Sequence, residues 1–220
     1  MTRIVLVVAK APVPGRVKTR LTPAVTPHQA ARIAAAALLD TVDTALATPG
    51  ARVAVALEGE LRDALRGDEL GALLGAADVF PQRGKGLPAR LANAHADLAE
   101  RHPAAWTVQI GMDTPQVTTA LLSGALDRLD AYDAVLGHAR DGGWWCLGLR
   151  DPRAADALRA VPTSRADTGR RTEAALSGRG HTVGAVAELS DVDTVVDARR
   201  VAALVPGSRF AAAVAEAVPC

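Results

Sequence analysis

The sequence predicts a three-layer α/β/α protein in which helices cover both faces of a mainly parallel sheet. Short apolar runs that are rich in β-branched residues, such as 3–9 and 106–110, alternate with stretches of helical spacing. This alternation indicates βαβ units, and therefore parallel strands. The two predicted strands within 134–149 are too closely spaced for a crossover helix, so we expect at least one antiparallel strand.

Each element follows from a local signal. The run 3–9 has the pattern of a strand that is buried on both faces. Thr26 and Pro27 supply an N-cap and a first-turn proline for a helix that ends near residue 47. Further strands are expected at 52–57, 78–80, 106–110, 134–136, 144–149 and 182–186. Further helices are expected at 60–65, 87–101, 116–129, 152–159, 165–177 and, with a break at 206–207, across 197–218.

The composition narrows the class of protein. The chain has 220 residues, with 25 basic against 24 acidic side chains. That length suits one domain, which we expect to span residues 1–220. The near-zero net charge argues against a nucleic-acid partner. Cys146 and Cys220 are too few for a disulfide framework or a four-thiolate zinc site. The first apolar run is too short to span a membrane and Lys10 follows it, so we expect a cytoplasmic protein.

Lysine is rare among the basic residues. Only Lys10, Lys18 and Lys85 are lysines, although the chain is rich in arginine. In such an arginine-rich chain, a lysine that has not been replaced by arginine indicates a position where a compact ammonium is needed rather than a planar guanidinium. All three lie in two segments, 10–21 and 82–91, which directs attention to these segments as binding loops.

The segment 10–21 directly follows the first predicted strand. Cations and free backbone N–H groups at a strand end suit a polyphosphate, although an exposed basic turn is the alternative. A Walker A loop is excluded, because Pro12 and Val17 occupy two of its glycine positions. The expected phosphate-binding residues are Lys10, Gly15, Arg16, Lys18 and Arg20.

The segment 82–91 contains two glycines ahead of a proline that suits the first turn of a helix. Such a turn can place a base or a ribose against backbone amides, while a glutamine side chain offers both a donor and an acceptor. A plain strand-to-helix connection is the alternative. The expected nucleotide-binding residues here are Gln82, Gly84, Lys85, Gly86 and Leu87.

Two acidic positions are candidate metal ligands. Asp113 comes directly after a buried strand, where a carboxylate suits Mg²⁺; the alternative is a helix cap, a task that Thr114 could also perform. Asp191 and Asp193 are two residues apart on an extended segment, so their carboxylates point the same way and could share a cation. The alternative for this pair is a solvated acidic turn that caps the next helix.

The segment 141–145 joins a turn to two adjacent tryptophans. Alternation predicts that one tryptophan faces the core and the other faces a ligand. Asp141 could bind an acceptor hydroxyl or act as a base, whereas a plain hairpin turn is equally consistent with Asp-Gly. The expected acceptor-binding residues are Asp141, Gly142, Gly143, Trp144 and Trp145.

Five motifs occur in a recognisable order: KAPVPGRVKTRL, QRGKGLPARL, IGMDTP, ARDGGWWCLGL and LSDVDT. Across about residues 3–200 the chain resembles the DUF2064 family of GT-A-fold (Rossmann-like) transferases, also labelled rSAM-associated transferase 1. That family is similar to the MobA-like and 2-phospho-lactate guanylyltransferase nucleotidyltransferases. The resemblance implies that Lys18 and Arg20 neutralise nucleotide phosphates, and that Gln82 and the turn 84–87 meet the base. It also implies that Asp113 and Asp193 hold Mg²⁺ or Mn²⁺.

Three functions remain open. In nucleotidyl transfer, a small phosphorylated acceptor attacks an NTP and pyrophosphate leaves; the cationic loop, with Lys18 and Arg20 as catalytic residues, favours this reaction. In glycosyl transfer, a nucleotide-diphospho-sugar donates its sugar to a hydroxyl. The segment 141–145 favours this reaction, because a tryptophan can support a sugar ring and Asp141 could act as the base. A non-catalytic nucleotide-binding protein is the third. The retained carboxylates and cations argue for an enzyme, and we expect a transferase that carries out nucleotidyl transfer.

Overall fold

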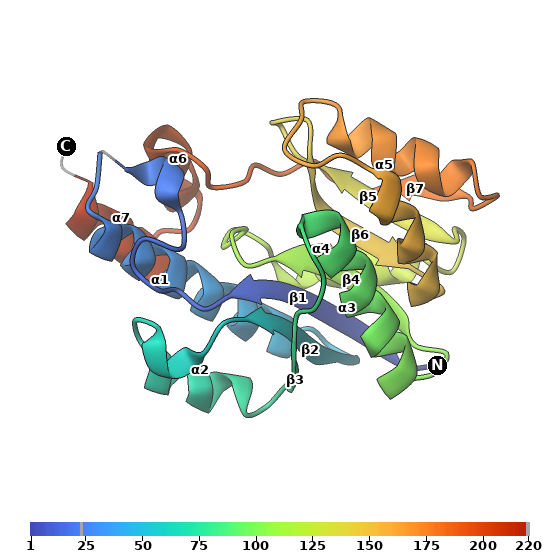
Figure 1. Cartoon of the computed structure of the whole chain (residues 1–220), viewed down its shortest axis with the longest axis horizontal. Coiled ribbons are helices and arrows are strands. Elements are labelled where there is room, and N and C mark those ends of the chain that lie inside the picture. Colours follow the sequence, from blue (N-terminus) through green and yellow to red (C-terminus); the bar gives the residue numbers. More distant parts are fainter. Residues whose placement is uncertain (23, 219–220) are drawn as a thin grey trace.

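The computed structural model describes residues 1–22 and 24–218 and is shown in Figure 1. Cys220 therefore lies outside the described residues, and Cys146 is a buried free thiol. Within the described residues a seven-stranded sheet has the order β3-β2-β1-β4-β6-β5-β7. Its strands are β1 (Arg3–Lys10), β2 (Ala51–Glu58), β3 (Asp78–Pro81), β4 (Trp106–Gly111), β5 (Ala134–His138), β6 (Trp144–Leu149) and β7 (Val183–Ala185).

The strand directions agree with the sequence prediction. Strand β1 pairs in parallel with both β2 and β4, and β2 pairs in parallel with β3. Strand β6 runs antiparallel to both of its neighbours, β4 and β5. The sheet is therefore mainly parallel with one reversed strand, and the carboxyl ends of β1, β2, β3 and β4 meet at the same edge.

Helices cover both faces of the sheet, which confirms the predicted fold class. Leu38 of α1, Leu70 of α2 and Leu126 of α4 pack on one face, whereas Leu91 and Leu98 of α3 pack on the other. Figure 1 shows α7 lying alongside α1. The helices are α1 (Pro27–Leu46), α2 (Gly67–Leu74), α3 (Leu87–Arg101), α4 (Thr119–Arg128), α5 (Thr168–Ser177), α6 (Val195–Leu204) and α7 (Arg209–Ala217).

Four helical predictions need correction. The predicted helix 116–129 begins only at Thr119, because Thr118 caps it by accepting a hydrogen bond from the Leu121 N–H. The segments predicted as helices at 60–65 and 152–159 are 3₁₀ turns, Leu61–Asp63 and Pro152–Ala160. The helix predicted from residue 165 begins at Thr168. In addition, the sequence did not predict α2. Among the described residues, no helix is both long and apolar enough to cross a membrane.

Candidate functional site

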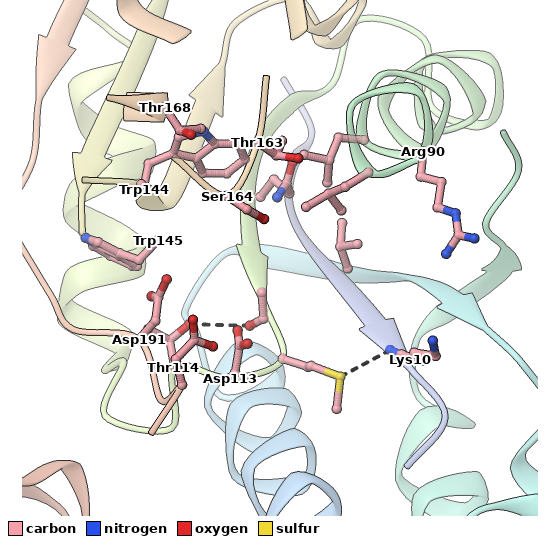
Figure 2. A pocket seen from close by; sticks show the side chains of 18 of the residues that line it. Lys10, Arg90, Asp113, Thr114, Trp144, Trp145, Thr163, Ser164, Thr168 and Asp191 are labelled. Atoms are coloured by element: carbon pink, nitrogen blue, oxygen red, sulfur yellow. Dashed lines mark hydrogen bonds between the residues drawn. The ribbon is translucent and has the colours of Figure 1, made fainter. Parts of the chain in front are cut away.

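A cleft of about 500 Å³ opens at the carboxyl ends of the parallel strands, where ligands bind in sheets of this kind. Figure 2 shows Lys10 and Arg90 on one side of it and Trp144, Thr163, Ser164 and Thr168 on the opposite side. The predicted site residues that line it are Lys10, Arg20, Gln82, Leu87, Asp113, Asp141, Gly143, Trp144, Trp145, Asp191 and Asp193.

Other predicted residues lie beside the cleft or away from it. Arg16 and Lys18 line an adjoining cavity of about 280 Å³, which shares Lys10, Arg20, Asp113 and Asp193 with the cleft. The remaining predicted residues line neither cavity; they are Gly15, Gly84, Lys85, Gly86 and Gly142. The loop after β1 therefore reaches the cleft mainly through its cationic side chains.

Lys18 joins three segments that are far apart in the sequence. Its Nζ lies 2.8 Å from Asp113 Oδ2 and 3.9 Å from Asp193 Oδ1, and it also donates to the carbonyl of Val192. The side chain is only 9% exposed, and the backbone of Lys18 is left-handed with φ of 47°. The ammonium thus draws together the loop after β1, the loop after β4 and the acidic segment 189–194.

The other cations of the loop are held less tightly. Arg20 Nη1 lies 2.5 Å from Asp193 Oδ2, but its side chain is 65% exposed. Lys10 Nζ lies 3.7 Å from Glu58 Oε2 at the end of β2. Two of the predicted phosphate-binding cations therefore contact the two predicted metal-binding carboxylates directly.

The carboxyls around Lys18 have displaced pKa values. Burial alone would raise the pKa of Asp113, but the charge and hydrogen bond of Lys18 outweigh it and hold the pKa below its usual range. Burial raises the pKa of Asp191 to about 7, and repulsion from Asp113 and Asp141 adds to this effect, while Lys18 opposes it. The site thus gathers more negative charge than its one buried ammonium balances.

The carboxylates suit a hard divalent cation. Lys18 already places one positive charge between Asp113 and Asp193, so a cation can interact with both. No group of three His, Cys, Asp or Glu side chains among the described residues is arranged to hold a metal ion. Mg²⁺ in phosphate-transferring sites is commonly held by one or two carboxylates together with substrate oxygens. The donor set fits that type of metal site.

Local structure supports the orientation of Asp113. Because Thr118 caps α4, neither Asp113 nor Thr114 serves as the helix cap. A side chain on Gly111 would bring its Cβ within 2.7 Å of Asp113 Oδ1, so the close approach of the carboxylate requires glycine there. The loop after β4 is thus shaped to place Asp113 beside Lys18.

The amide nitrogen of Gln82 makes hydrogen bonds within the fold. This Nε2 donates to the carbonyls of Ala9 and Ala56, at 2.7 and 2.9 Å, and so ties together the ends of β1 and β2. The predicted contact with a nucleotide base can therefore use the side-chain oxygen of Gln82 but not its amide nitrogen without breaking these bonds.

The two tryptophans differ in burial, although both line the cleft. Trp145 is 2% exposed and donates from Nε1 to the Ala187 carbonyl, whereas Trp144 is half-buried and donates to Thr172. A register shift at Gly137 and His138 disturbs the pairing of β5 with β6, which explains how adjacent residues both reach the cleft.

The turn before Trp144 has a structural role as well. Asp141 Oδ1 accepts a hydrogen bond from the Gly143 N–H at 2.8 Å, as the hairpin alternative requires, while Asp141 also lines the cleft. Gly142 has φ of 89°, and a Cβ there would lie 2.0 Å from the Ala166 carbonyl oxygen. Gly142 is thus required by the backbone rather than placed against a ligand.

Several cleft residues were not predicted. Arg90 lies within one of the recognised motifs, and Glu58 ends a predicted strand at the binding edge, so both carried a usable signal. Gln109 lies within a buried strand run, and the loop after residue 162 has no recognisable motif. The unpredicted polar and charged lining residues include Glu58, Arg90, Gln109, Thr163, Ser164, Arg165 and Thr168.

Comparisons with known proteins agree with the fold. Residues 41–165 match the model of a family described as an uncharacterised protein conserved in bacteria (DUF2064). A structure of a candidate nucleotide-diphospho-sugar transferase from Desulfovibrio desulfuricans G20 is 27% identical, with a TM-score of 0.84; the match covers 98% of this chain and 95% of that one. No curated protein matches the sequence significantly.

More distant structures share the same fold. Rv0371c from Mycobacterium tuberculosis H37Rv, in complex with manganese, is 25% identical with a TM-score of 0.55, over 91% of this chain and 97% of that one. A CMP:2-keto-3-deoxy-manno-octonic acid synthetase complexed with CTP is 13% identical with a TM-score of 0.55, over 93% and 98% of the two chains. The predicted fold is confirmed, and the presence of transferases among these neighbours agrees with the expectation of an enzyme.

Proposed function

For this chain, which belongs to the DUF2064 family, we propose a metal-dependent nucleotidyl transfer from an NTP to a small phosphorylated acceptor, with release of pyrophosphate. The observation that carries the proposal is the cluster of Lys18, Asp113 and Asp193 at the binding edge of the sheet. It brings a buried cation and two carboxylates from three separate segments to the place where the cleft meets the adjoining cavity. We further propose that residues 1–220 act as one catalytic domain.

The cations of the loop after β1 bind the phosphates. A triphosphate carries more negative charge than a diphosphate diester, and Lys10, Arg16, Lys18 and Arg20 lie at or beside the cleft. Lys18 and Arg20 exchange a carboxylate partner for a phosphate oxygen when the nucleotide enters. Once they contact the phosphates, these cations stabilise the charge that develops on the leaving pyrophosphate.

Asp113 and Asp193 hold Mg²⁺ or Mn²⁺. The manganese complex of Rv0371c supports a divalent metal in a protein that is similar to this one. When bound, the metal neutralises phosphate charge and helps to orient the phosphates. Release of Lys18 from Asp113 frees both the ammonium for phosphate and the carboxylate for the metal.

The half of the cleft near Trp144 receives the acceptor. A phosphorylated acceptor is already a nucleophile at neutral pH, so this half of the site needs to orient the acceptor rather than deprotonate it. Trp144 supplies a half-buried aromatic wall, and Arg165 supplies a cation for an anionic acceptor. Nucleotide and acceptor would then meet above Asp113.

Glycosyl transfer is the second candidate. The half-buried Trp144 can support a sugar ring, and Asp141 keeps one carboxylate oxygen free of the Gly143 hydrogen bond to act as a base. The similarity to the Desulfovibrio desulfuricans structure favours this reaction. The two reactions differ in the nucleotide that the cleft prefers.

A thermal-shift panel separates the two reactions. The four NTPs and a set of nucleotide-diphospho-sugars are compared with and without Mg²⁺ or Mn²⁺. We expect one NTP with metal, at about 100 times its Kd, to raise the unfolding free energy by about 2.7 kcal/mol and Tm by about 5–10 °C. Stabilisation by a nucleotide-sugar and by no NTP would contradict nucleotidyl transfer, and stabilisation by neither would contradict both reactions.

A further inference from the structure

A buried glutamine at the floor of the cleft has not been assigned a role. Gln109, on the central strand β4, is only 2% exposed, yet it lines the cleft. Neighbouring residues on β4 are apolar or small, so a long polar side chain here requires hydrogen-bond partners. Where those partners are found determines what the side chain is available to do.

One end of the Gln109 amide is held by a fully buried histidine. His95, on α3, places its Nε2 3.1 Å from Gln109 Oε1, and the hydroxyl of Thr107 lies 3.5 Å from His95 Nδ1. Burial lowers the pKa of His95 to about 4, although the hydrogen bond with Gln109 opposes this shift. The imidazole is therefore neutral at pH 7. It donates from Nε2, which fixes the amide oxygen toward the core.

The other end of the amide faces the cleft. Among the described residues, Gln109 Nε2 has no hydrogen-bond partner. The described side-chain polar atoms that lack a partner and are fully sealed from solvent are Thr41 Oγ1 and Gln116 Oε1, and Gln109 Nε2 is not one of them. Gln109 Nε2 is thus not sealed within the protein, and the cleft is the space that Gln109 lines. The result is a donor at the cleft floor, oriented by a second buried side chain and unused within the chain.

The surroundings of this donor indicate the kind of group it binds. Val8, Leu91 and Trp144 line the same cleft and make this part of the floor largely apolar, which disfavours a phosphate. The cations and carboxylates of the phosphate site lie beyond the end of β4, and Gln82 and Leu87 lie toward the ends of β2 and β3. In every nucleotide, a sugar connects the base to the phosphates.

We propose that the Gln109 amide is a specificity-determining donor to a sugar hydroxyl of the bound nucleotide, and that His95 is its positioning residue. The inference rests on the proposed nucleotide-dependent function. The hydroxyl belongs either to the ribose or to the hexose of a nucleotide-sugar. The chemistry at Gln109 is the same in both cases: an uncharged oxygen accepts from a preoriented N–H.

The test compares nucleotide affinities by calorimetry in the presence of Mg²⁺. The probes are each NTP with its 2′-deoxy and 3′-deoxy forms, and UDP-glucose with UDP. Gln109→Met keeps the length of the side chain and removes the donor; Gln109→Glu provides a second variant if the first does not fold. Leu98→Met, a fully buried change on α3 away from the cleft, controls for altered core packing.

A ribose contact predicts that the wild type binds one NTP about five to ten times more tightly than a deoxy form, and that Gln109→Met abolishes this ratio. A hexose contact predicts that Gln109→Met lowers affinity for UDP-glucose relative to UDP and leaves the NTP ratios unchanged. His95→Phe should reduce the same ratio as Gln109→Met, and combining the two should reduce it no further. A residue that acts only on stability would leave the ratio unchanged.

Either loss of selectivity supports the assignment. Wild-type ratios in Gln109→Met, with nucleotide binding intact, would overturn the inference and leave the proposed function standing. A wild type that binds nucleotides without distinguishing any of these pairs would also overturn it. A wild type that binds no nucleotide would overturn the proposed function itself, and this inference with it.

Discussion

Lys18→Ala is expected to weaken NTP binding by about 10- to 100-fold, because a charge-assisted hydrogen bond to phosphate contributes about 1.5–3 kcal/mol. Isothermal calorimetry with Mg²⁺ measures this change. The same substitution leaves Asp113 without its ammonium, so the free energy of unfolding should also fall, by about 1–3 kcal/mol. The lower end is expected, since the Asp113 side chain is about one third exposed.

Arg32→Ala provides the matched control for Lys18→Ala. Arg32 is an exposed cation that pairs with Glu216 away from the cleft, and its loss should alter neither NTP affinity nor stability by much. Unchanged NTP affinity in a folded Lys18→Ala protein would remove Lys18 from the phosphate site. A fall in stability alone would show that Lys18 only supports the loops.

Asp113→Asn is expected to abolish the metal dependence of nucleotide binding and to lower turnover by at least about 100-fold. The amide keeps the shape of the side chain but loses the negative charge that a divalent cation requires. Nucleotide affinity measured across a Mg²⁺ titration tests this expectation. Affinity that still rises with Mg²⁺ as in the wild type would show that Asp113 is not a metal ligand.

The stability difference between the wild type and Asp113→Asn should also depend on pH. The pKa of Asp113 is lower in the folded protein than in the unfolded chain, so its ion pair stabilises the fold above the unfolded pKa. The wild type should therefore unfold at a higher temperature than Asp113→Asn at pH 7, and the difference should close as the pH falls below about 4. Asp127→Asn, which removes an exposed partner of Arg3, is the matched control.

Local signals were enough to predict most of the fold. The Thr26-Pro27 cap predicted the start of α1, which forms a capping box with Gln29, and the periodicity of 87–101 matches α3 residue for residue. Where long-range contacts decide, prediction failed. Arg66 precedes α2 in a left-handed conformation without a side-chain cap, so the acidic Asp68 and Glu69 of the first turn give only a weak start signal.

Some residues of the candidate site were likewise predictable from local signals, and others were not. Asp113 and Lys18 were identifiable because each follows a buried strand within a distinctive motif, and the sheet topology brings them together. Their direct contact was not predictable, since it depends on how three loops fold over one edge. A role for Gln109 was not predictable either. In the sequence it is one polar residue within a buried strand, and only the structure shows its hydrogen bond with His95.

A crystal of the protein grown with Mn²⁺ and the NTP that binds most tightly tests the central proposal most directly. We predict an anomalous manganese peak in contact with the carboxylates of Asp113 and Asp193, and phosphates in contact with Lys18 and Arg20. Lys18 would then no longer lie 2.8 Å from Asp113 as it does in the structure described above. Manganese at another place, or a nucleotide outside the cleft with the Lys18–Asp113 pair intact, would contradict the proposed site.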